Sequence, residues 1–299
     1  MTTPRAAGKR DWMGIPARIE TRPFGPRGTP VPWLGQGTWL IEDARRADAI
    51  AALRRGFDLG MTHVDTAEMY GDGRVEQILA EAMAGRRDAL FVVSKVLPQN
   101  ATYDGTIAAC ERSLARLRTD RLDVYLLHWP SEHPLEETLR AFAKLEQDGK
   151  ILSCGVSNFQ AQDIERAVAL AGPGRIACNQ VRYQLEERGI EHEDLPCCER
   201  HGIAVVGYSP FGRGGFPSGR TPGGRVLAEI AAAHGATPRQ VALRFLARRP
   251  SLFLIPKAAS VAHVEQNAAA DALVLGEDDA RRIDRAFPAA VAAEPRSRR

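Results

Sequence analysis

The stretch Leu90–His128 contains two apolar runs, LFVVSK at residues 90–95 and LDVYLLH at residues 122–128, separated by an amphipathic segment at Thr106–Leu117. Short apolar runs rich in β-branched residues predict buried strands, and the segment between them has the length and periodicity of a helix. A strand, a helix and a second strand in this order form one βαβ unit, in which the two strands are parallel.

The same alternation continues along most of the chain. The 267 residues from Trp33 to the end give about 33 residues per strand and helix, close to the ~30 of a βαβ unit. Eight such units close into a barrel, so the sequence predicts an α/β fold, a (β/α)8 TIM barrel in a single domain. We expect the first strand within Leu34–Leu40 and the others at Thr62–Asp65, Leu90–Lys95, Leu122–His128, Ser153–Ser157, Ile176–Val181, Ile203–Ser209 and Leu252–Lys257. Further helices are expected at Asp43–Leu59, Leu135–Gln147, Ala161–Leu170 and Pro238–Arg248.

An open, doubly wound sheet is the alternative fold. Such sheets usually carry a glycine-rich phosphate-binding turn after an early strand. The only early candidate, Gly71-Asp72-Gly73, is a fragment of that fingerprint in the wrong context. The barrel is therefore the preferred fold.

The composition bounds the class of protein. The chain has 299 residues, of which 44% are hydrophobic and 26% charged, the ordinary balance of a globular protein. No stretch approaches the ~20 apolar residues of a membrane span, and the N-terminus lacks the apolar segment of a secretory signal. Five cysteines with no paired CxxC spacing predict a reducing, cytoplasmic setting without a disulfide framework or zinc site. We interpret the adjacent Cys197 and Cys198 as packing residues, with a redox role as the alternative.

The positive charge lies at the two ends of the chain. Residues 1–27 carry a local charge of +4 and the last six residues +2, which leaves about −3 of the total +3 for residues 28–293. A slightly acidic body does not favour nucleic-acid binding. We expect residues 1–27 to form a basic, partly disordered N-terminal arm and residues 28–299 to form the barrel domain.

Polar side chains end every predicted strand after the first. The carboxyl ends of the strands of such barrels form the active site, so we expect these side chains to meet at one rim. They are Asp65 with Tyr70 five residues on, Lys95, His128, Ser157 with Asn158, Asn179 with Gln180, Tyr208 with Ser209, and Lys257.

The positions of the lysines indicate which chemistry this rim could perform. The chain has 5 lysines and 35 arginines, yet Lys95 and Lys257 both end apolar strands. A tyrosine is a poor acid at neutral pH until a cation stabilises its phenolate, and Lys95 could supply that cation to Tyr70 while Asp65 holds the lysine. His128 could orient a substrate oxygen. These residue types suit proton transfer to a carbonyl oxygen, which requires a separate hydride source, and they include neither a metal-ligand cluster nor the nucleophile–base pair of a hydrolase.

Three motifs resemble the aldo-keto reductase superfamily. They are Asp65-Thr-Ala-Glu-Met-Tyr70, Gly155-Val-Ser-Asn-Phe159, and Ile255-Pro-Lys257 followed by Glu265-Gln-Asn267. The likeness extends from about Trp33 to Phe287 in the same order. More narrowly, Gly35-Gln-Gly-Thr-Trp39, Leu126-Leu-His-Trp-Pro130 and Ile255-Pro-Lys-Ala-Ala259 are similar to short-loop bacterial members, including methylglyoxal-reductase types.

The resemblance implies a role for each matching residue. Tyr70 corresponds to the general acid, Lys95 and Asp65 to its activating pair, and His128 to the histidine that orients the carbonyl. Trp39, Met69 and Trp129 correspond to the substrate pocket. The cofactor-binding positions are Thr38, Ser157, Asn158, Gln180, Tyr208, Ser209, Lys257, Ser260, His263, Gln266 and Asn267.

The resemblance also implies NADPH as the cofactor. In the family, the residue matching Lys257 and a basic residue six positions later grip the 2′-phosphate, and the second position is often arginine. Here it is His263, and Gln266 replaces a frequent glutamate. A histidine with an ordinary pKa near ~6.5 is mostly neutral at pH 7, so we expect NADPH to bind more weakly at higher pH.

The expected substrates are small aldehydes and activated ketones, dicarbonyls such as methylglyoxal among them, because the segment Phe211–Gly224 is short. Arg213 and Arg220 either favour anionic substrates or are simply solvated. Two other functions remain open, a Schiff-base aldolase that uses Lys95 and a cofactor-binding redox sensor that docks onto a partner. We expect no nucleic-acid or membrane partner and, because a closed barrel has no open sheet edge, a monomer.

Overall fold

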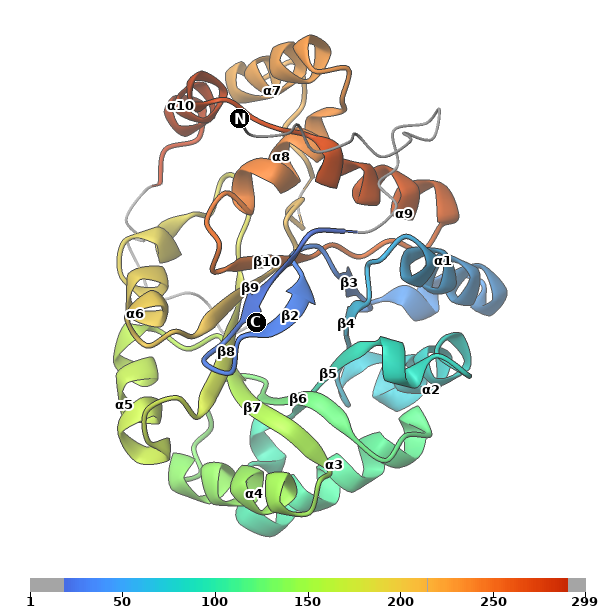
Figure 1. The fold of residues 1–299 in the computed structure, drawn as a ribbon, viewed down its shortest axis with the longest axis vertical. Coiled ribbons are helices and arrows are strands. Elements are labelled where there is room, and N and C mark those ends of the chain that lie inside the picture. Colours follow the sequence, from blue (N-terminus) through green and yellow to red (C-terminus); the bar gives the residue numbers. More distant parts are fainter. Residues whose placement is uncertain (1–18, 214, 290–299) are drawn as a thin grey trace, which may run out of the picture.

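The computed structural model describes residues 19–213 and 215–289, and within them eight parallel strands surround a central axis with helices on the outside (Figure 1). The strands pair in chain order, from β3 to β10. Their bounds are β3 Gln36–Gly37, β4 His63–Asp65, β5 Phe91–Val96, β6 Leu122–Leu127, β7 Ile151–Ser157, β8 Ile176–Arg182, β9 Ala204–Tyr208 and β10 Leu252–Ile255. Each lies within a few residues of its predicted position, and the barrel fold is confirmed.

Close backbone approach joins the first strand to the last. The Gly35 amide donates to the Leu254 carbonyl at 2.8 Å, and Gly37 forms a parallel bridge with Lys257. A Cβ on Gly37 would lie 2.6 Å from the Ile255 carbonyl oxygen of β10, so only glycine allows this approach. The ring of strands therefore closes through β3 and β10, and the doubly wound alternative is wrong.

Ten α-helices lie in the described residues, most of them between consecutive strands. They are α1 Arg46–Asp58, α2 Arg74–Ala82, α3 Tyr103–Leu117, α4 Leu135–Gln147, α5 Ala161–Ala171, α6 Asp194–Arg200, α7 Pro222–Ala233, α8 Pro238–Leu246, α9 Val261–Ala268 and α10 Glu277–Ala286. Short 3-10 turns are η1 Ile41–Asp43, η2 Tyr70–Gly73, η3 Arg87–Ala89, η4 Pro98–Asn100, η5 Gly189–Glu191 and η6 Ala269–Ala272. None of the described helices has the length and apolar character that crossing a membrane requires.

A hairpin of β1 (Thr21–Phe24) and β2 (Thr29–Pro32) lies across the barrel (Figure 1). The ring of Phe24 packs edge-on against Phe91 at 5.0 Å and Phe253 at 4.9 Å between centroids. Both partners lie at the start of their strands, so the hairpin covers the amino end of the barrel. The boundary expected at residue 28 falls between the two strands of this hairpin. Residues 1–18 of the predicted arm lie outside the described residues.

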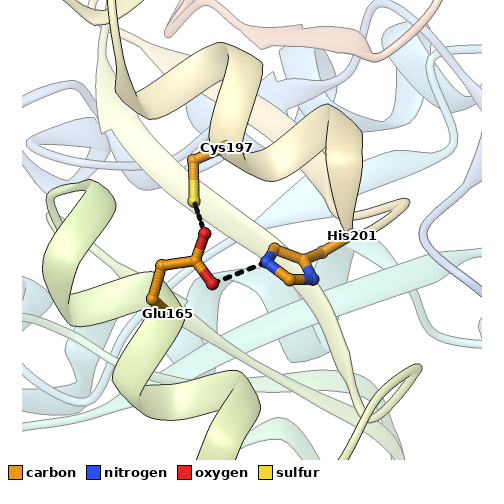
Figure 2. A group of neighbouring side chains, drawn as sticks. All are labelled: Glu165, Cys197 and His201. Carbon is orange, nitrogen blue, oxygen red and sulfur yellow. Dashed lines mark hydrogen bonds and ion pairs between the residues drawn. The ribbon is translucent and has the colours of Figure 1, made fainter.

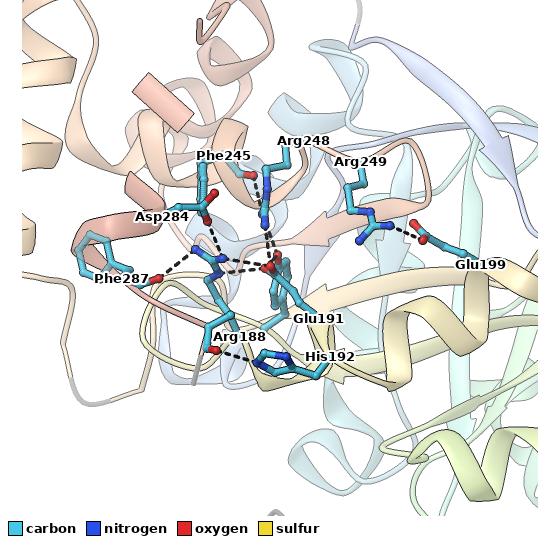
Figure 3. Close-up of polar contacts among 11 residues, drawn as sticks. Arg188, Glu191, His192, Glu199, Phe245, Arg248, Arg249, Asp284 and Phe287 are labelled. Atoms are coloured by element: carbon cyan, nitrogen blue, oxygen red, sulfur yellow. Dashed lines mark hydrogen bonds and ion pairs between the residues drawn. The ribbon is translucent and has the colours of Figure 1, made fainter. Parts of the chain in front are cut away.

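The buried side chain of Arg188 forms hydrogen bonds with the end of helix α10 (Figure 3). Arg188 donates to the Phe287 carbonyl at 2.9 Å and to Asp284 at 2.6 Å, both at the end of α10. The same guanidinium contacts Glu191 at 2.9 Å, and Arg248 contacts that carboxylate at 2.7 Å. The charge of Arg188 is thus fully paired, as burial of a guanidinium requires.

Candidate active site

Asp65, Lys95 and Tyr70 form one contact cluster at the carboxyl rim of the barrel. Asp65 ends β4, Lys95 lies near the end of β5, and Tyr70 begins η2. The Lys95 Nζ lies 2.6 Å from Asp65 Oδ1, 2.7 Å from the Thr66 carbonyl oxygen and 3.2 Å from the Tyr70 hydroxyl. All three side chains are buried. The strand alternation in the sequence thus brings together the residues that it predicted would meet.

The turn after Tyr70 accounts for the run Gly71-Asp72-Gly73, the fragment of a phosphate-binding fingerprint in the sequence. Gly71, Asp72 and Gly73 all have positive φ, at 54°, 52° and 84°. A Cβ on Gly73 would lie 2.6 Å from the Arg116 side chain. Glycine and aspartate tolerate the left-handed conformation, which most residues avoid. This run therefore shapes the turn that follows Tyr70.

The charges in this cluster set the protonation of its members. Burial alone would lower the pKa of Lys95, but the Asp65 carboxylate and the Tyr70 hydroxyl outweigh burial and raise it. Burial raises the pKa of Tyr70, and Lys95 acts in the opposite direction. Lys95 is therefore a cation and Tyr70 a protonated phenol near neutral pH, which is the state of a loaded proton donor.

His128 stands beside this cluster. Its ring packs edge-on against Tyr70 at 5.8 Å and lies 4.8 Å from the Trp129 ring. Burial, together with the charge of Lys95, lowers the pKa of His128 well below its usual value. Its Nδ1 is buried without a hydrogen-bond partner within the described residues. A neutral imidazole next to the donor phenol can hydrogen-bond a substrate oxygen without competing for its proton.

A second set of polar groups lines the rim at β7, β8 and β9. The Tyr208 hydroxyl donates to Asn158 Oδ1 at 2.9 Å, and Asn158 Nδ2 donates to the His128 carbonyl at 2.9 Å. Ser157 Oγ donates to the Gln180 carbonyl at 2.9 Å. Asn158, which follows β7, and Ser209, which follows β9, both have positive φ, at 60° and 51°. Hydrogen bonds thus join Asn158 to Ser157 and Tyr208, and Ser157 to the main chain of Gln180.

The other predicted cofactor-binding residues follow β3, in the case of Thr38, or lie after β10 and on α9. Thr38 is buried, and its hydroxyl donates to the Asp65 carbonyl at 2.8 Å. Lys257 is exposed beyond β10, and Ser260 caps α9 by accepting from the His263 amide at 3.4 Å. His263 and Gln266 are exposed, whereas Asn267 is buried. An exposed lysine beside a capped helix N-terminus suits a phosphate group.

Residues 33–287 match the sequence model of the aldo/keto reductase family. The chain belongs to this family. It is 44% identical over 261 residues to methylglyoxal reductase YeaE of Escherichia coli, an alignment covering 87% of this chain and 92% of that protein. It is 32% identical to glyoxal reductase of Bacillus subtilis, covering 86% and 89%.

Solved structures of aldo-keto reductases also resemble the chain. One is an aldo/keto reductase from Klebsiella pneumoniae in complex with NADP and acetate, at 41% identity and a TM-score of 0.85, covering 93% of this chain and 98% of that one. Another is the thermostable aldo-keto reductase Tm1743 in complex with the inhibitor epalrestat, at 37% identity and a TM-score of 0.84, covering 90% and 100%.

Trp39, Met69 and Trp129 are half-buried in this reductase. Arg213, whose role the sequence left open, lies over the Trp39 ring. The Arg213 guanidinium lies 4.2 Å from the Trp39 ring centroid and 5.8 Å from that of Tyr208. It therefore stacks on aromatic rings. Arg213 and Arg220 are both exposed.

Sequence reasoning missed two features of the site. Gln180 Nε2 donates to Asp65 Oδ2 at 2.7 Å, although the two residues are 115 positions apart. The second feature is the Thr66 carbonyl that holds Lys95. A main-chain acceptor has no signature in the sequence, and the Gln180 contact depends on the closed ring of strands. The rim position of Gln180 was the one signal available.

Proposed function

We propose that the chain reduces small aldehydes and activated ketones to alcohols with NADPH, dicarbonyls such as methylglyoxal among them. The observation that carries the proposal is the buried contact of the Tyr70 hydroxyl with the Lys95 ammonium, which Asp65 holds in place. A phenol next to a fixed cation is a proton donor for a carbonyl oxygen. The printed names of the methylglyoxal and glyoxal reductases support this substrate class.

Each member of the cluster contributes one part of the proton transfer. Tyr70 gives its hydroxyl proton to the carbonyl oxygen as that oxygen gains charge. Lys95 stabilises the phenolate that forms, and Asp65 keeps the lysine charged and oriented. His128 donates a hydrogen bond that positions the carbonyl oxygen near Tyr70. Hydrogen-bond donors that are already in place when charge develops on the carbonyl oxygen lower the activation free energy, because the site does not have to reorganise.

The residues of the second set fit a nicotinamide cofactor. Ser157, Asn158 and Gln180 offer hydroxyl and amide groups for the carboxamide, and the Tyr208 ring offers a face for stacking. Lys257 and Ser260 would hold the 2′-phosphate at α9, with His263 beside them. NADPH supplies the hydride when bound, and the Klebsiella pneumoniae relative crystallised with NADP supports this choice.

The same geometry weighs against an aldolase. A Schiff-base lysine must lose its proton to attack a carbonyl, and burial next to a cation usually lowers its pKa for that purpose. Lys95 instead contacts three oxygen atoms, and its pKa is raised. A redox sensor would keep this cluster but turn over slowly. We further propose that the reductase works as a cytoplasmic monomer on small molecules.

The test compares wild type with Tyr70→Phe in NADPH oxidation by methylglyoxal. We expect the variant to lose about 10²- to 10⁴-fold in kcat, the usual contribution of a general acid, with NADPH binding retained. The matched control is Tyr125→Phe, because the Tyr125 hydroxyl is buried on β6 without a partner in the described part of the chain. Equal turnover in Tyr70→Phe and wild type would remove Tyr70 as the acid. Slow wild-type turnover with tight NADPH binding would favour the sensor.

A further inference from the structure

We propose that Glu165, Cys197 and His201 form a zinc-binding site on the outer layer of helices, where α5 meets α6. Figure 2 shows the three side chains converging, Glu165 from α5 and the other two from α6 and its end. These residues have no part in the chemistry proposed at the rim. The chain therefore has a second site, of a kind that its cysteine spacing did not predict.

The local sequence places two of the ligands together. Cys197 and His201 are four residues apart, so one turn of helix puts them on the same face. Glu165 lies one turn into α5, and the side chains of α5 and α6 meet across the gap between the helices. Thiolate, imidazole and carboxylate are the three side-chain types that bind Zn²⁺.

The distances between the ligand atoms suit a small ion. Cys197 Sγ lies 3.3 Å from Glu165 Oε1, and His201 Nε2 lies 2.9 Å from Glu165 Oε2. All three ligand atoms fall within 4.8 Å of one another. Zinc bonds of about 2.0 to 2.3 Å place neighbouring ligands of a tetrahedron about 3 to 4 Å apart. An ion between them needs only a small outward shift of the carboxylate, and water would be its fourth ligand.

Charge and access also favour a divalent cation. Binding replaces the Cys197 thiol proton, which is released to solvent, and leaves a thiolate and a carboxylate that balance the two positive charges. The Glu165 and His201 side chains are 49% and 27% exposed, so the ion can enter from solvent. Cys197 is buried beneath them.

Arg200 is the competitor of the ion. Its Nη2 lies 3.0 Å from Glu165 Oε1, the same oxygen that the Cys197 thiol contacts. The Arg200 side chain is 61% exposed and can turn into solvent when a metal arrives. Removing its charge should therefore tighten metal binding, whereas a purely structural ion pair would only be weakened by the same change.

The experiment uses Co²⁺ as the probe on the full chain, without a histidine tag and after treatment with a chelator. Cobalt bound to a thiolate gives a sulfur-to-metal charge-transfer band. We expect one equivalent to bind wild type with this band and Zn²⁺ to displace it. We expect Cys197→Ser to lose the band, His201→Gln to bind more weakly, and Arg200→Gln to bind more tightly. Cys198→Ser is the matched control, since Cys198 is the adjacent buried cysteine outside the group.

Several outcomes would overturn the proposal. They are wild type without a stoichiometric cobalt band, a band that persists in Cys197→Ser, and affinities of His201→Gln and Arg200→Gln that both equal that of wild type. Melting curves and NADPH oxidation check that each variant is folded. If Cys197→Ser fails to fold, the variants of His201 and Arg200, whose side chains are partly exposed, still decide the question.

Discussion

Lys95 carries a completely buried charge, and three oxygen atoms from one short segment, residues 65–70, surround its ammonium group in place of solvent. They belong to the Asp65 carboxylate, the Thr66 main chain and the Tyr70 hydroxyl. A buried ammonium is tolerated only when it is paired and hydrogen-bonded in this way. Because Tyr70 is one of the three, transfer of its proton strengthens the contact with Lys95 at the moment when negative charge appears on the phenolate.

His128 should work in its neutral form over the whole ordinary assay range. Its pKa lies well below 6.5 because the ring is buried and faces the charge of Lys95. With saturating NADPH, we expect kcat/KM for methylglyoxal to vary by less than about twofold between about pH 5.5 and 8. A pH profile of wild type and His128→Asn checks this. An acid limb near pH 6.5 that His128→Asn abolishes would contradict it.

His263→Arg tests the cofactor end of the site. His263 is exposed on α9, whose N-cap is Ser260 and which follows Lys257. A guanidinium can hold a 2′-phosphate through two charged hydrogen bonds, worth about 1.5 to 3 kcal/mol each. We expect the variant to bind NADPH at least about tenfold more tightly while NADH binding is unchanged.

Fluorescence titration with both cofactors measures this preference, and Arg220→Gln, on an exposed arginine of another segment, serves as the control. An equal gain for NADH and NADPH would show that His263 does not lie near the 2′-phosphate.

Among the elements, the strands were predictable and the hairpin was not. Buried parallel strands appear in the sequence as apolar runs, which is why β5 and β6 match their predicted ranges almost to the residue. The hairpin contains Pro23, Pro30 and Pro32, and proline argues against a strand. These prolines are tolerated because β1 and β2 pair only with each other.

In the candidate site, too, some features could be predicted from the sequence and others could not. Its rim residues were predictable because the carboxyl end of a barrel strand is a position that periodicity locates. Contacts such as Gln180 with Asp65, or Arg213 over Trp39, depend on which way a side chain turns in the folded packing. The group of Glu165 and Cys197 likewise joins residues 32 positions apart across two helices.

Phe24→Ala tests the role of the hairpin. The ring is 3% exposed and packs against the strand starts at the amino end of the barrel. Truncating a buried phenylalanine costs about 3 to 5 kcal/mol, and we expect this loss in urea unfolding. The KM for NADPH should stay the same because the rim lies at the opposite end.

The control is Val274→Ala, at a side chain that is 74% exposed. A loss in Phe24→Ala no larger than in this control would mean that the hairpin contributes little to stability.

At the scale of the whole molecule, chemistry and stability lie at opposite ends of one barrel. The carboxyl rim holds the charged cluster around Lys95, whereas the amino end is closed by aromatic packing around Phe24 and His63. The C-terminal helix α10 is fastened separately, through Arg188. Because the two ends are separate, we expect substitutions at the carboxyl rim to leave the packing at the amino end intact, and substitutions at the amino end to leave the rim intact.

The response of the whole molecule to acid should depend on His63, which begins β4 and is completely buried. Its ring packs edge-on against Phe91 at 5.4 Å, and neither ring nitrogen has a hydrogen-bond partner in the described residues. Burial, with a smaller effect of Lys95, lowers the pKa of His63 from 6.5 to about 3.

Between these two pH values the unfolded chain binds a proton at His63 that the folded chain does not bind. The free energy of unfolding therefore falls as the pH falls below 6.5, by about 1.4 kcal/mol per pH unit from this group, and is unaffected by it above 6.5. We expect the stability of His63→Leu, measured by urea unfolding from about pH 7 to 4.5, to decline less steeply than that of wild type by about this slope. Parallel curves for the two proteins would mean that the folded chain takes up the proton at His63 as readily as the unfolded chain does.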